Sequence, residues 1–107
     1  MAGITSALCT SFKVELLEGD HDFNNGADAF KVALFKANAS ITGTYSAATT
    51  NYSDMTGNSD ELPNGSGYTT TGFALTNVNP TSSGTTAFTD FSANASWSSA
   101  TFTTRGC

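Results

Sequence analysis

The sequence predicts a mainly β protein: a small antiparallel β-sandwich or sheet with one N-terminal α-helix. Three observations indicate this class. The chain contains 18 Thr and 13 Ser residues, and Thr favours extended strands. Short apolar runs recur between clusters of Gly, Asn, Ser and Pro, which are typical of turns. One segment near the start shows helical periodicity instead. With 107 residues we expect a single domain over 1–107, with a helix at 5–17 and a β-rich part at 29–107.

The N-terminal helix is expected over residues 5–17 because apolar side chains there recur every four residues. The stripe consists of Ile4, Leu8, Phe12 and Leu16. Thr5 or Ser6 can cap its start, and Gly19 stands where a C-terminal glycine belongs.

Further apolar residues of this helix lie off the stripe, which indicates burial on more than one side. In so small a protein we expect the second side to pack against a neighbouring subunit. The expected interface residues are Leu8, Phe12, Val14, Leu16 and Leu17.

After the helix we expect a polar turn at Asp20–Asp28 and then a strand at 30–35. Phe30, Val32 and Leu34 alternate with Lys31, Ala33 and Phe35, so the two sets occupy opposite faces of that strand. Residues 38–68 are mostly Ser, Thr, Asn and Gly, and we expect a long loop region there with few anchors. Its length is awkward for a compact domain unless it holds short edge strands or a functional loop.

The C-terminal part is expected to supply the remaining strands. These are predicted at 72–78, 85–91 and 95–104, with a turn at 79–84 and a hairpin around 92–94. Trp97 and Phe102 have opposite parity, so either a bulge lies near Ser98–Ser99 or both faces of the last strand are covered.

The polar turn offers the one weak candidate for a metal site. Its oxygen-bearing side chains follow the Asp-x-Asp-x-Asn spacing of calcium loops, with candidates at Asp20, Asp22, Asn24 and Asp28. Glycine comes one position late at Gly26, and Lys31 stands where a bidentate Glu is needed. Asp and Asn are also common in ordinary turns, so we expect a solvated turn, no metal and no cofactor.

Composition argues against catalysis and nucleic-acid binding. His21 is the only histidine, and no Gly-x-Ser-x-Gly elbow supplies a nucleophile. The carboxylates of Asp54, Asp60 and Glu61 share one polar loop, where a fixed spacing for glycoside chemistry is not expected. Four Lys and Arg residues cannot neutralise a run of phosphates, and the net charge is −5. We expect no catalytic residues.

Membrane insertion and a disulfide framework are not expected either. The longest uninterrupted aliphatic or aromatic run, Val32–Phe35, is far shorter than the roughly 20 residues of a membrane helix. Cys9 and Cys107 are expected to be two free thiols.

Four aromatic residues leave a glycan-binding module open as an alternative. Aromatic faces stack on sugars, and the candidates are Tyr45, Tyr52, Tyr68 and Trp97. The simpler interpretation makes Trp97 a core residue.

The order of several short segments resembles a family of small virion structural proteins of tailed bacteriophages. The similar segments are Ile4–Cys9, Ser11–Leu17, Phe30–Phe35, Gly65–Tyr68, Leu75–Val78, Asp90–Phe91 and Trp97–Gly106. The resemblance implies a non-catalytic building block of the particle, made in the host cytoplasm and located in the virion. A capsid decoration or cement protein is expected first, and a tail or baseplate protein second. Its partners would be major capsid or tail proteins and copies of itself, as a homo-oligomer.

Overall fold

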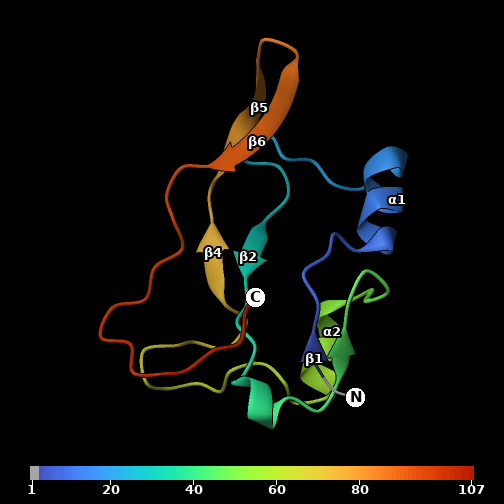
Figure 1. Ribbon diagram of the computed structural model, residues 1–107. Coiled ribbons are helices and arrows are strands. Elements are labelled where there is room, and N and C mark those ends of the chain that lie inside the picture. The colour runs from blue at the N-terminus through green and yellow to red at the C-terminus, as the bar shows by residue number, and fades with distance from the viewer. Residues whose placement is uncertain (1–2) are drawn as a thin grey trace.

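The computed structural model describes residues 3–107, so residues 1 and 2 of the expected domain lie outside the described part. The chain is mainly β with few helices (Figure 1). The elements in order are β1 (Gly3–Ile4), α1 (Thr10–Glu18), β2 (Phe30–Val32), the 3-10 helix η1 (Asn38–Ser40), β3 (Thr44–Tyr45), α2 (Tyr52–Gly57), β4 (Phe73–Leu75), β5 (Asn77–Ser83) and β6 (Thr86–Phe91).

Three two-stranded ladders form within residues 3–107, and they do not join into one sheet. β2 pairs antiparallel with β4, with Lys31 opposite Ala74. β5 pairs antiparallel with β6 and forms a hairpin that projects from the rest of the molecule (Figure 1). β1 pairs parallel with β3, with Ile4 opposite Tyr45, whereas only antiparallel pairing was predicted. The mainly β class is confirmed, and its strands are short and dispersed.

The N-terminal helix exists, but it begins five residues later than predicted. Residues 3 and 4 form β1 instead, because the N–H of Thr5 donates to the carbonyl of Tyr45 at 2.9 Å. Thr5 and Ser6 therefore do not cap the helix, and Cys9 occupies the N-cap position. The C-terminal prediction is confirmed: Gly19 has φ 81° and its N–H donates to the carbonyls at the end of α1.

Residues 38–68 were predicted as a long loop with few anchors, and this was wrong. The segment contains η1, β3 and α2, and it contributes most of the core. The buried hydrophobic residues among 3–107 are Leu34, Ile41, Tyr45, Met55, Leu62 and Tyr68, and all except Leu34 come from this segment. Isolated large side chains separated by Ser and Thr show no periodicity, so the pattern did not predict their burial.

The core consists of two clusters on opposite sides of the segment that contains β2. Leu34, Leu62 and Tyr68 form the first cluster, and Ile41, Tyr45 and Met55 form the second. Val32 packs against the first, whereas Ala33 and Phe35 pack against the second. The predicted alternation is therefore confirmed from Val32 to Phe35, although the strand β2 itself ends at Val32.

The segment 95–104 is not a strand, contrary to the prediction. Residues 92–107 are irregular, and a turn at Ser98–Ser99 gives Ser99 a φ of 51°. This turn brings Trp97 and Phe102 onto the same cluster despite their opposite parity. The segment predicted as the turn 79–84 is mostly strand β5, with the turn at Gly84–Thr85.

Candidate functional site

Helix α1 carries three exposed aliphatic side chains, those of Val14, Leu16 and Leu17. None of the nine described residues of α1 is buried. Four of the five predicted interface residues are exposed: Leu8 by 56%, Val14 by 48%, Leu16 by 39% and Leu17 by 92%. Leu8 precedes α1, and the other three lie on it. Contiguous exposed aliphatic side chains are typical of a surface that another molecule covers.

Phe12, the fifth predicted interface residue, instead faces the protein and is half-buried. Its ring lies 5.0 Å from the ring of His21 and 6.3 Å from that of Phe23, measured between ring centroids. Phe23 stacks on Phe30 of β2 at 4.5 Å. His21 Nε2 lies 2.7 Å from Glu15 Oε2. These contacts attach α1 to the body, so Phe12 belongs to the attachment of the helix rather than to its outer face.

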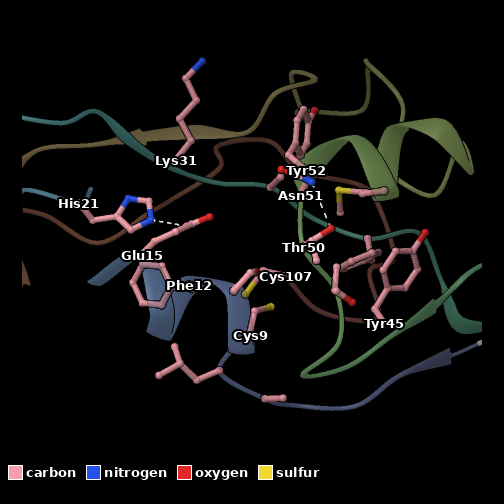
Figure 2. A pocket seen from close by; sticks show the side chains of 17 residues that line it. Cys9, Phe12, Glu15, His21, Lys31, Tyr45, Thr50, Asn51, Tyr52 and Cys107 are labelled. Carbon is pink, nitrogen blue, oxygen red and sulfur yellow. Dashed lines mark hydrogen bonds and ion pairs between the residues drawn. The ribbon is translucent and has the colours of Figure 1, made fainter. Parts of the chain in front are cut away.

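A cleft of about 560 Å³ lies between α1 and the second core cluster (Figure 2). Phe12 and Glu15 line it from α1, and Phe35, Tyr45 and Met55 line it from the opposite side. Its volume falls within the range of small-molecule pockets. The sequence did not predict it, because its walls come from segments far apart in the chain.

The side-chain oxygen atoms of the polar turn accept hydrogen bonds from within the turn itself. Asp22 Oδ1 accepts the N–H of Asn24 at 2.9 Å, and Asp28 Oδ2 accepts the N–H of Asp22 at 2.8 Å. The side-chain amide of Asn77 donates to the carbonyl of Asp28 at 2.8 Å and so attaches the turn to β5. Of the calcium candidates, the turn thus brings Asp22, Asn24 and Asp28 together through hydrogen bonds. In the described part of the chain, no group of three or more His, Cys, Asp or Glu side chains could hold a metal ion.

Asp60 is fully buried and is the centre of a hydrogen-bond network. Its carboxylate accepts the N–H of Thr42 at 2.8 Å, the N–H of Gly43 at 2.7 Å and the hydroxyl of Tyr45 at 2.6 Å. Burial alone would raise the pKa of Asp60, but these hydrogen bonds, together with that from the Thr42 hydroxyl, outweigh it. The net pKa lies below its ordinary value, and the pKa of Tyr45 is raised, mainly by burial.

Glu61 and Asp54 also serve the protein's own structure. Glu61 accepts hydrogen bonds from the hydroxyls of Tyr52 and Tyr68 and from the N–H of Thr71. Burial, with this carboxylate contributing, raises the pKa of Tyr68 to about 12. Asp54 accepts the N–H groups of Asn51 and Thr50 at the start of α2, which lowers its pKa.

The aromatic residues considered for glycan binding do not form one exposed surface. Tyr45 and Tyr68 are buried, at 4% and 2% exposure, and cannot stack on a sugar. Trp97 packs against the first core cluster, as the core interpretation predicts. Tyr52 is exposed by 47%.

Comparison with protein-family models, with curated proteins and with solved structures gives no match for this chain. Among the helices of residues 3–107, none is long and apolar enough to cross a membrane. Inference about function therefore depends on the surface of the chain itself.

Proposed function

We propose that this protein is a non-catalytic structural protein of a tailed-phage virion. It binds the outer surface of the capsid and acts there as a decoration or cement protein. A tail or baseplate position is the alternative within the same class. Its partners are major capsid or tail proteins and copies of itself. Neighbouring subunits would extend the short ladders toward the antiparallel β-sandwich or sheet that the sequence predicts.

The observation that carries this proposal is the exposed apolar face of α1. Leu16 and Leu17 stand near the end of α1 and are both exposed, whereas Phe12 contacts the body through the ring of His21. Burying one such side chain against a partner contributes about 1.5 to 3 kcal/mol. Covering this face with a partner is therefore more favourable than leaving it exposed to water.

The total exposed surface supports the same conclusion. The chain exposes 6964 Å², whereas a folded monomer of 11.0 kDa is expected to expose about 5600 Å². The excess, roughly 1,300 Å², is larger than the ~800 Å² that one partner contributes to a standard interface. Binding only to an assembled particle would stabilise that particle by mass action. The net charge of −5 suits a station facing away from packaged DNA.

The test measures incorporation of the chain into particles of the phage whose genome encodes it. We expect quantitative mass spectrometry of purified particles to find the protein, and Leu17→Ser with Val14→Ser to reduce its copy number at least about tenfold. Ser53→Ala, an exposed change on α2, is the matched control and should leave the copy number unchanged. A particle that lacks the protein would contradict the proposal, as would micromolar binding to a glycan array.

A further inference from the structure

The two cysteines, at opposite ends of the chain, lie in the same part of the molecule. Cys9 and Cys107 both line the cleft beside α1, and both also line a neighbouring cavity of about 360 Å³ (Figure 2). Both are free thiols; Cys9 is half-buried and Cys107 is exposed, so each is open to a reagent in solution.

Backbone contacts fix Cys9 to the segment that follows β3. Its thiol donates to the carbonyl of Ser46 at 3.8 Å, and the N–H of the next residue, Thr10, donates to the carbonyl of Ala47 at 2.8 Å. Tyr45, directly before this segment, packs its ring against that of Phe35 with a centroid separation of 4.6 Å.

Phe35 in turn fixes the position of Cys107. The N–H of Phe35 donates to the carbonyl of Gly106 at 2.8 Å, and the hydroxyl of Thr104 donates to the carbonyl of Phe35 at 2.6 Å. The two cysteines are therefore attached to neighbouring segments. Cys107 lies one residue beyond the hydrogen bond at Gly106, and it lines the same two cavities as Cys9.

We propose that Cys9 and Cys107 form a dithiol site that closes to an intramolecular disulfide when it meets a small disulfide such as oxidised glutathione. One thiolate attacks the glutathione disulfide, which forms a mixed disulfide and releases one reduced glutathione. The other cysteine then attacks the protein sulfur of that mixed disulfide and releases the second glutathione. The protein loses two electrons and two protons, and one oxidised glutathione becomes two reduced glutathione molecules.

Closure joins the start of α1 to the C-terminal segment and closes a loop over nearly the whole chain. Pairs of cysteine thiols stay reduced in the cytoplasm and form disulfides outside the cell. This chemistry belongs to the isolated chain and does not require a virion. Because the closed loop is long, we expect the oxidised protein to melt at least about 5 °C above the reduced protein.

The test equilibrates the purified protein with oxidised glutathione, blocks remaining thiols with N-ethylmaleimide and measures the intact mass. We expect a monomer that carries neither glutathione nor maleimide and has lost two hydrogens. Cys9→Ser and Cys107→Ser are the matched controls, and each should instead retain one glutathione or one maleimide, because the second step needs both thiols. The reduced, unmutated protein should also become fluorescent with dibromobimane, which fluoresces strongly when it bridges two nearby thiols.

Several outcomes would overturn the dithiol site. These are two maleimide groups on the treated protein, two separate glutathione adducts, covalent dimers as the main product, or no bridging fluorescence above that of the single variants. An oxidised protein that melts at or below the temperature of the reduced one would show that the bond does not form in the native arrangement.

Discussion

At the scale of single residues, Asp60 places an ionised carboxylate where only hydrogen-bond donors face it. An amide in its place would retain one acceptor and would direct its NH₂ group at the N–H and hydroxyl donors of Thr42, Gly43 and Tyr45. We expect Asp60→Asn to lower the free energy of unfolding by about 2 to 4 kcal/mol at pH 7. Urea denaturation measures this, with the exposed Asp20→Asn as a control that should stay within about 0.5 kcal/mol.

The pH dependence of this difference follows from the lowered pKa of Asp60. A carboxyl group whose pKa is lower in the folded state contributes stability that is fully present above the unfolded value, about 3.9. That contribution is lost as the pH falls through the folded value. We therefore expect the difference in unfolding free energy between the unmutated protein and Asp60→Asn to shrink as the pH falls below about 4. A difference that stays constant from pH 7 to pH 2 would contradict this account.

At the scale of elements, Gly72 permits the close approach of β2 and β4. Its φ is 85°, and a Cβ atom there would lie 2.1 Å from the carbonyl oxygen of Val32. We expect Gly72→Ala to cost about 3 kcal/mol or more, because it adds both a clash and a strained backbone. Thermal unfolding measures the loss. Gly57→Ala, at a position with open space, is the control and should cause none.

If Gly72→Ala had the same melting temperature as the unmutated protein, the contact between β2 and β4 would have to open without a cost in free energy. The second core cluster, which does not include this ladder, would then carry the stability alone.

Elements with regular patterns were predictable, whereas those fixed by distant contacts were not. The alternation over residues 30–35 identified side chains on two faces, although β2 ends at Val32. Gly19 identified the end of the helix correctly. The helix start was misplaced because Ile4 also fits the helical stripe, and only its pairing with Tyr45 makes it a strand. The missed helix α2 had a signal in the Asn51-to-Asp54 spacing of a capping box.

The candidate site was predictable only in part, for the same reason. Val14 and Leu17 were predicted off the apolar stripe and are exposed on α1. Leu8, which precedes α1, and Leu16 are also exposed, although they belong to the predicted stripe. The inward position of Phe12 depends on aromatic partners in the turn and in β2, which helical periodicity does not describe. The cleft depends on the path of the whole chain.

At the scale of the whole molecule, the chain is more extended than its length requires. Its radius of gyration is 15.2 Å, whereas a compact domain of 107 residues is expected to have about 13 Å. The projecting β5–β6 hairpin contributes to this shape (Figure 1), and within β5 only Asn77 is buried. Stability therefore concentrates in the part of the chain around the two core clusters.

This uneven distribution predicts an order of hydrogen exchange in the isolated protein. Amides that tie the core segments together should exchange slowest, as in the bonds from Leu62 N–H to the Leu34 carbonyl at 2.8 Å and from Lys36 N–H to the Asp60 carbonyl at 2.9 Å. Amides of the β5–β6 hairpin and of α1 should exchange at least about a hundredfold faster, because few buried contacts support them.

Mass spectrometry after deuterium labelling measures this order. Repeating it on particles that contain the protein, as the proposed function predicts, tests whether α1 docks on a partner. If α1 docks on a partner, its amides should become slow on the particle while those of residues 34–62 change little. If the amides of the β5–β6 hairpin in the isolated protein exchanged as slowly as those of residues 34–62, the uneven distribution of stability would be contradicted. If the exchange rates of the α1 amides were the same on the particle as in the isolated protein, α1 would not be part of the interface. A helix that docks on a partner is stabilised, and its amides then exchange more slowly.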